Sequence, residues 1–169
     1  MKLSAFEAVV KALHDRQVQY LVAGGLAVNA HGYIRTTMDI DLVVALNADN
    51  IRQAFDALAS LGYHPLVPIS AQNFADPNQR QRWRDEKGMQ VLNFHSDIHP
   101  GVGVDVFVYE PFDFSHECER ALQGELLPGI VTRFVSIPTL IAMKQAAGRP
   151  RDLDDIEHLQ VLQKEISDE

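Results

Sequence analysis

Two aspartates one residue apart interrupt an apolar run, and this feature limits the possible folds more than any other. Asp39 and Asp41 lie in the segment DIDLVVA, residues 39–45, whose remaining residues are typical of a buried strand. In a strand, positions i and i+2 point to the same face, so we expect both carboxylates to project together. Adjacent carboxylates repel each other unless cations match them, and Mg²⁺ is the simplest such cation.

A pair of glycines lies shortly before this run. Gly24 and Gly25 follow the apolar segment 20–23 and precede a short helical pattern that ends near His31. Because glycine has no Cβ, it lets a phosphate approach the backbone closely. A phosphate-binding turn beside paired carboxylates predicts nucleotide chemistry.

A third aspartate lies in a later apolar run. Asp105 is the only charged residue of VGVDVFV, residues 102–108, and a buried carboxylate is costly unless it is paired or bound to metal. Beside Asp39 and Asp41 it would complete a site for two Mg²⁺ ions about 3.5–4 Å apart. Asp39 and Asp41 would bind both ions and the nucleotide phosphates, and Asp105 would bind the second ion and accept the proton of the attacking hydroxyl. For Asp39 and Asp41 alone, a solvated strand end is the alternative, which the glycines and Asp105 disfavour.

Length and charge limit the class of protein. A chain of 169 residues is long enough for one domain with a sizeable core. Its net charge of −8 argues against a broad nucleic-acid-binding surface, although a local basic patch is still compatible. No apolar run approaches the roughly 20 residues that span a bilayer. The single cysteine, Cys118, excludes an internal disulfide and fits a reducing compartment. We therefore expect one cytoplasmic domain over residues 1–169, with no membrane attachment.

The order of apolar patterns predicts an α/β (α+β) domain with a central mixed β-sheet flanked by helices. We expect strands near residues 20–23, 39–45, 63–67, 89–94, 102–108 and 131–135. We expect helices near residues 4–16, 26–31, 50–61, 115–122, 138–147 and 153–164. Residues 70–88 are polar and are assigned no element.

These residues together resemble the signature of the nucleotidyltransferase (polymerase-beta-like) superfamily. That signature is Gly-Gly or Gly-Ser, a short helix, Asp-x-Asp and a third carboxylate on a later strand; Gly24-Gly25, Asp39-Ile40-Asp41 and Asp105 match it. The segments 31–42 and 140–156 are similar to small AbiEii-type and minimal nucleotidyltransferases of bacteria. The resemblance implies a nucleotidyltransferase fold with C-terminal helices, an NTP substrate such as ATP, and two Mg²⁺ ions for which Mn²⁺ can substitute.

The sequence departs from that family pattern at two points. Gly25 stands where many relatives have serine, which removes a hydroxyl and leaves backbone N–H groups to bind the terminal phosphate. The chain also has little room for the further helical domain with which many toxins of this group bind their acceptor. Both departures leave the acceptor open.

Further residues are candidates for nucleotide binding. The resemblance implies that Lys144 contacts a nucleotide phosphate, the alternative being a solvated lysine. Arg35 could contact phosphate or support the acidic site, and a surface ion pair is the alternative. Thr37 would support the metal-binding strand through its hydroxyl. An ion-pair and helix-capping cluster is the favoured interpretation of a nearby group: Arg149, Arg151, Asp152 and Asp155.

A basic segment is a candidate surface for the acceptor. Arginine binds phosphate with two hydrogen bonds and tryptophan can stack on a base, so an acceptor-binding role is possible for Arg80, Arg82, Trp83 and Arg84, with Lys87 beside them. The alternative is a solvated helix face with Trp83 anchored in the core, and this interpretation is favoured.

The function that these features predict is Mg²⁺-dependent transfer of a nucleoside monophosphate from an NTP to an acceptor hydroxyl, with release of pyrophosphate. The acceptor could be RNA, a protein or a small molecule. The net charge slightly favours a protein or a cationic small molecule, whereas the basic segment slightly favours RNA. A role in a toxin–antitoxin system with a partner protein is compatible with the resemblance. The rival hypothesis is a non-catalytic module of the same fold that binds nucleotide or a partner.

Overall fold

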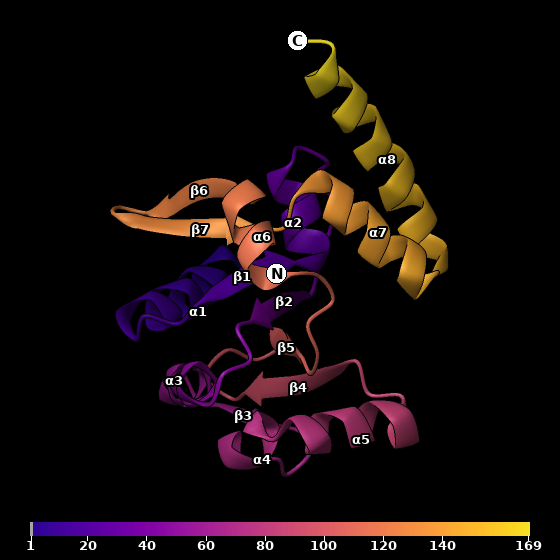
Figure 1. Ribbon diagram of the computed structural model, residues 1–169. Coiled ribbons are helices and arrows are strands. Elements are labelled where there is room, and N and C mark those ends of the chain that lie inside the picture. The colour runs from indigo at the N-terminus through magenta and orange to yellow at the C-terminus, as the bar shows by residue number, and fades with distance from the viewer. Residues whose placement is uncertain (1) are drawn as a thin grey trace.

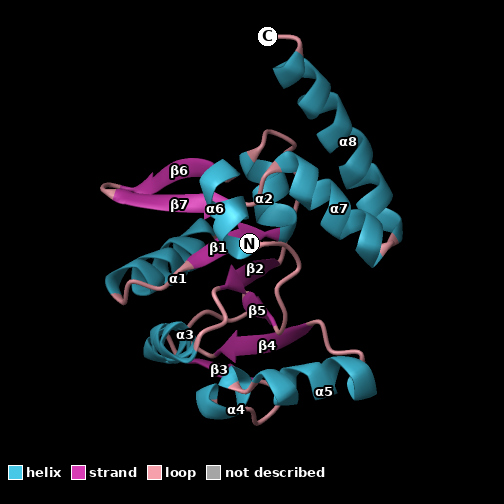
Figure 2. Cartoon of the chain, viewed as in Figure 1, coloured by secondary structure: helices cyan, strands magenta, loops and turns pink. Residues whose placement is uncertain are grey.

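A mixed β-sheet of seven strands organises the chain, and helices cover parts of both faces (Figures 1 and 2). The computed structural model describes residues 2–169. The strands are β1 (Tyr20–Ala23), β2 (Asp39–Val44), β3 (Tyr63–Pro65), β4 (Val91–Ser96), β5 (Gly103–Phe107), β6 (Leu122–Leu127) and β7 (Ile130–Phe134). The helices are α1 (Leu3–Asp15), α2 (Gly24–Ala30), α3 (Ala48–Ser60), α4 (Ala71–Ala75), α5 (Pro77–Lys87), α6 (Phe114–Arg120), α7 (Ile137–Ala147) and α8 (Pro150–Ser167).

The strand order places β2 and β5 side by side although they are distant in sequence. The order is β3-β4-β5-β2-β1-β7-β6. β2 runs parallel to β5, and β1 runs parallel to β7, while the other neighbours are antiparallel. Parallel neighbours need a long crossover, and here the chain between β2 and β5 supplies α3, β3, α4, α5 and β4.

Buried apolar side chains alternate with exposed polar side chains along β4, and this shows which face of the sheet the helices cover near β3. Leu92 and Phe94 are buried, whereas Asn93 and His95 are exposed on the opposite face. Phe94 packs edge-on against Phe55 of α3 at 5.2 Å, and Phe55 packs against Phe74 of α4 at 5.4 Å. Figure 1 shows α3, α4 and α5 gathered at this end, whereas α2 and α7 lie near the other half of the sheet. The face that carries Asn93 is therefore open over β4.

The last helix, α8, packs against α7 with its first half and then extends away from the sheet (Figure 1). Ile156 and Leu159 are buried in the first half, whereas Val161 and Ile166 are more than half exposed. No helix within residues 2–169 has both the length and the apolar character needed to cross a membrane.

The expected α/β class with a mixed sheet is confirmed, and the main differences from the expectation concern four elements. β6 was not expected, because LQGELL lacks the alternation of a half-buried strand and forms as the hairpin partner of β7. α4 and α5 occupy the segment assigned no element; Asp76 caps α5 by accepting a hydrogen bond from the Asn78 N–H, and Gly88 ends it at φ +61°. α2 begins at Gly24, two residues before the expected start.

Candidate active site

The three aspartates lie on two adjacent parallel strands. Asp41 of β2 is the register partner of Asp105 of β5, and Asp39 is the partner of Gly103. Because direct partners and i+2 neighbours share a face, all three carboxylates project from the same side of the sheet. A Cβ at Gly103 would lie only 2.8 Å from Asp39 Oδ1, so glycine makes room for that carboxylate. The structure thus brings together the acidic residues that the sequence singled out.

Gly24 lies directly against the three aspartates Asp39, Asp41 and Asp105, which we call the acidic row. Its φ is +62°, a left-handed conformation that favours glycine, and a Cβ built on it would overlap the Asp41 carboxylate. A Cβ on Gly25 would approach Thr37 Oγ1 to 2.7 Å and Arg35 Nη1 to 3.1 Å. The glycines therefore allow the start of α2 to pack beside the strand and loop that carry the other candidate residues.

Asp41 is held where its negative charge is unfavourable. Burial raises the pKa of Asp41 to about 7, and the charges of Asp105 and Asp39 add to the increase. The positive charges of Arg149 and Lys144 oppose it, so both cations lie within electrostatic reach of Asp41. Carboxylates that repel one another in a partly buried place are suited to binding cations.

Asn93 of β4 fixes the third carboxylate, and it was not among the residues singled out from the sequence. Asn93 is the register partner of Asp105 on the side away from Asp41, and its Nδ2 donates a hydrogen bond to Asp105 Oδ1. Burial raises the pKa of Asp105, and Asp39 adds to this, whereas the Asn93 bond and the charge of His95 lower it. The alternation of apolar Leu92 and Phe94 with polar neighbours is the sequence signal that could have identified Asn93.

The donor set of the acidic row fits a hard divalent cation. Asp39, Asp41 and Asp105 offer only carboxylate oxygens, which are the ligands that Mg²⁺ prefers. Within residues 2–169, no three His, Cys, Asp or Glu side chains are already gathered around one point that could hold an ion. The three aspartates form an open row, and an ion bound there would offset the repulsion that raises the pKa of Asp41.

Lys144 is buried in an ion-pair network, not solvated. Its Nζ lies 2.7 Å from Asp155 Oδ2 and 3.5 Å from Asp152 Oδ1, and all three side chains are at least 94% buried. Arg35 binds Asp155 through two hydrogen bonds of 2.7 Å, which ties the loop before β2 to α8. The contact between Lys144 and nucleotide phosphate therefore stays a prediction, because both carboxylates already engage the ammonium group.

Arg149 is the more accessible cation near the row. Its side chain is 58% exposed, and its Nε donates to Asp152 Oδ2 at 2.9 Å while its backbone N–H donates to the same oxygen at 3.0 Å. Asp152 thus caps the start of α8, as the capping interpretation predicts. Part of the Arg149 guanidinium remains free to meet an anionic ligand.

Thr37 supports the loop only weakly. Its Oγ1 lies 3.5 Å from the Asp39 carbonyl oxygen, at the limit of a hydrogen bond. Asn29 of α2 contributes more, since its side chain bonds both the N–H and the carbonyl oxygen of Arg35 at 3.0 Å. Asn29 was not singled out from the sequence either.

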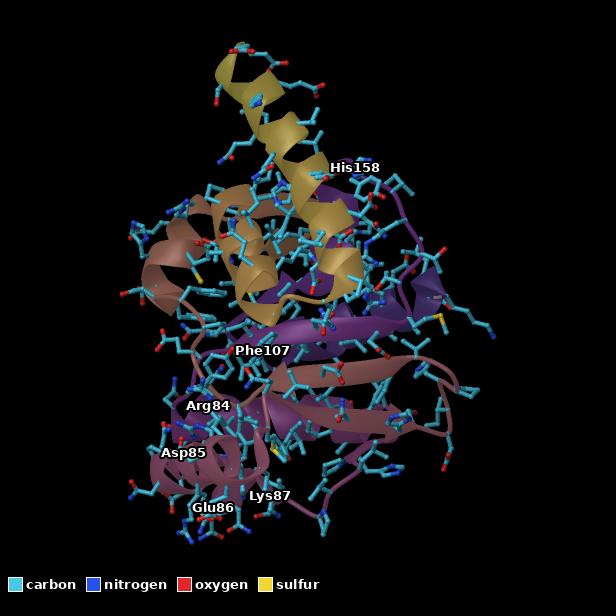
Figure 3. The ribbon with its side chains drawn as sticks, turned by 90° about the vertical axis from the view of Figure 1, so that its right-hand side faces the viewer. Arg84, Asp85, Glu86, Lys87, Phe107 and His158 are labelled. Atoms are coloured by element: carbon cyan, nitrogen blue, oxygen red, sulfur yellow. The ribbon has the colours of Figure 1, made fainter. Side chains whose placement is uncertain are left out.

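The basic segment does not form one exposed cationic surface. Arg80 is buried and donates to the Phe74 carbonyl oxygen at 2.6 Å, and Trp83 packs against the Phe74 ring at 6.4 Å. Arg84 lies 3.7 Å above the Tyr109 ring, on the side of α5 that faces the strands in Figure 3. Only Arg82, of the four expected residues, is exposed. Three of the four are used in packing, with Trp83 anchored as the favoured alternative describes, and an acceptor-binding role for the segment stays a prediction.

Known structures share this architecture. No protein-family model matches the sequence, and no curated protein is significantly similar to it. The antibiotic-resistance factor ANT(2'')-Ia in solution is similar with a TM-score of 0.57 and 14% identity, over 98% of this chain and 91% of that one. The lincomycin-bound lincosamide antibiotic adenylyltransferase LnuA has a TM-score of 0.58 and 12% identity, over 91% of this chain and 93% of that one.

A third similar structure comes from Thermotoga maritima and is described as a nucleotidyltransferase. Its TM-score is 0.55 and its identity 13%, over 99% of this chain and 93% of that one. At such identities the likeness concerns the fold and not the activity. Together with the acidic row and the glycine start of α2, it leads to one conclusion: this chain has the nucleotidyltransferase fold.

Proposed function

We propose that the protein is a Mg²⁺-dependent nucleotidyltransferase that moves a nucleoside monophosphate from an NTP to a hydroxyl of a small molecule, releasing pyrophosphate. The observation that carries this proposal is the register pairing of Asp41 with Asp105 beside Gly24. Simple nucleotide binding would not need a third carboxylate on a separate strand. A partly buried row of carboxylates next to an open face is suited to charge neutralisation during phosphoryl-type transfer.

A small-molecule acceptor is favoured by two observations. ANT(2'')-Ia has been solved with adenylyl-2''-tobramycin, and LnuA with lincomycin. The basic segment that favoured RNA is mostly engaged in packing, which removes the main argument for a nucleic-acid acceptor. A toxin–antitoxin role and a protein acceptor remain predictions from the sequence.

Different residues of this chain would serve different steps of the reaction. Divalent cations held by the three aspartates would neutralise the nucleotide phosphates. Asp105, oriented by Asn93 through one oxygen, has its other oxygen available to take the proton of the acceptor hydroxyl. The hydroxyl oxygen forms a bond to the α-phosphorus as the bond from that phosphorus to the bridging oxygen breaks, and pyrophosphate leaves. The exposed part of Arg149, whose charge acts on Asp41, would bind the departing phosphates.

The test measures pyrophosphate release and product mass with each NTP, Mg²⁺ or Mn²⁺, and a panel of hydroxylated small molecules. We expect transfer by the natural protein and a loss of at least about a thousandfold in Asp41→Asn and Asp105→Asn, since positioning and charge neutralisation supply most of the rate. Asp49→Asn, which alters an exposed carboxylate on α3, is the matched control and should retain activity. Activity that survives both site substitutions would refute the proposal. Tight Mg²⁺–NTP binding without turnover on any acceptor would favour the non-catalytic module.

A further inference from the structure

Beyond Asp105, the face of the sheet that carries the three aspartates continues over β4 and β3, where Asn93 orients Asp105 and the other exposed residues have no role in the reaction described above. Next to Asp105, β4 presents Asn93 and His95 on this face, and β3 presents His64, the register partner of His95. Leu66 follows β3, and its N–H donates to the Asn93 carbonyl oxygen at 2.9 Å. All four side chains are exposed, and we call them the acceptor face: His64, Leu66, Asn93 and His95.

The strand register joins the acceptor face to the three aspartates. Asp41, Asp105 and Asn93 occupy one register level across three strands. One level along, Asp39 is the register partner of Gly103, and the Asp39 carboxylate occupies the space that a side chain at Gly103 would fill. His95 lies two residues after Asn93 on β4, so its side chain projects from the same exposed face as that of Asn93. A ligand on this face could therefore place a hydroxyl at Asp105.

The polar groups of the acceptor face have unused hydrogen-bonding capacity. Asn93 donates one side-chain N–H to Asp105, and its Oδ1 accepts no hydrogen bond within residues 2–169. The His95 ring has no hydrogen-bond partner in the part of the chain that the structure describes. His64 Nδ1 lies 3.4 Å from the Gly62 carbonyl oxygen, which leaves Nε2 available. Carboxamide and imidazole groups both donate and accept, as hydroxyl groups do.

The chemistry of these four residues indicates which acceptor fits. None of them is a carboxylate, so a polycation would find no opposite charge there beyond the three aspartates, which bound metal would neutralise. Leu66, 59% exposed, offers an apolar surface beside the polar groups. Uncharged sugars combine hydroxyl groups with an apolar C–H face. On the premise of the proposed function, we propose that the acceptor face binds an uncharged hydroxylated ring such as a sugar, with Asn93 and His95 positioning the reacting hydroxyl at Asp105.

The test follows imidazole signals by NMR as uncharged sugars or tobramycin are added to the protein loaded with Mg²⁺ and an α,β-methylene NTP analogue. We expect a sugar of the panel to shift the His95 and His64 signals and leave His116, an exposed histidine on α6, unchanged. His95→Ala should weaken sugar binding about tenfold and raise the acceptor KM with little change in kcat, as loss of one hydrogen bond implies. His116→Ala is the matched control.

Two outcomes would overturn this inference: no sugar shifts the two signals, or transfer to tobramycin is preferred and unaffected by His95→Ala. Calorimetry of the α,β-methylene analogue alone tests the proposed function separately. If the natural protein and Asp41→Asn bind Mg²⁺ and the analogue equally, or neither binds them, the proposed function itself fails. Binding by the natural protein alone, without sugar shifts, overturns only the acceptor assignment.

Discussion

Asp41 shows how the surroundings of one residue make the stability of the protein depend on pH. Burial and the neighbouring carboxylates raise its pKa to about 7, whereas an aspartate in an unfolded chain has a pKa of about 3.9. Between these values the unfolded chain loses the proton while the folded protein keeps it. The contribution of Asp41 to the free energy of unfolding of the metal-free protein therefore falls as pH rises from about 4 to about 7. Above that range the contribution of Asp41 is constant.

The substitution Asp41→Asn removes this charge while keeping the shape of the side chain. In EDTA above pH 7 we expect the variant to be more stable than the natural protein by a few kcal/mol, because each pKa unit corresponds to about 1.4 kcal/mol. Urea denaturation at several pH values between 4 and 8 measures the effect. Mg²⁺ should stabilise the natural protein at pH 8 and the variant much less. If the free energies of unfolding of the two proteins ran parallel as a function of pH, this account would be contradicted.

Among the helices, the link between α7, α8 and the loop before β2 is made by buried ion pairs. Asp155 is the central member, since it accepts from Arg35 and from Lys144 at 2.7 Å. Burial acts to raise the pKa of Asp155, but the bonds to these two cations outweigh it and keep the pKa below its usual range. The same helices hold Arg149 near Asp41, so the network also supports the site.

Removing Asp155 should therefore be costly. Asp155→Ala leaves the Lys144 ammonium buried with only Asp152, and we expect a loss of about 3–5 kcal/mol of stability, as for other broken buried pairs. Asp154→Ala is the matched control on the same helix; Asp154 accepts only exposed bonds, from the Tyr33 hydroxyl among others, and its loss should be far smaller. Thermal unfolding of both variants measures the difference. Equal losses would show that Asp155 is not the central member of the network.

The sequence predicts local parts of the site better than the contacts between elements. The period of two in a strand is enough to place Asp39 and Asp41 on one face, and the apolar surroundings identify Asp105. The pairing of Asp41 with Asp105 depends on which distant strands become neighbours, and no local pattern contains that information. Lys144 is a similar case, because a lysine on a helix is expected in solvent until the carboxylates of the next helix enclose it.

For the whole molecule, one sheet that includes the strands from both ends of the chain predicts one cooperative unit. We expect a single unfolding transition, with circular dichroism and the fluorescence of Trp83 giving the same midpoint. Trp83 is the only tryptophan and lies on α5 against Phe74 of α4, at the end of the sheet opposite β6 and β7 (Figure 1), so it reports on the part most distant from those strands. Separate midpoints would show two independent units and would contradict the expectation of one domain over residues 1–169.

The crossover between β2 and β5 has a consequence for how such a protein can change. Every residue of the acceptor face belongs to this single continuous segment, whereas the three aspartates lie on the strands at its two ends. Replacing the segment while retaining Asn93, which holds Asp105, would exchange the rest of the surface that meets the acceptor and keep the carboxylates in place. A chain built in this way can acquire a new substrate by local replacement, and grafting the same segment between relatives is a direct route to engineered specificity.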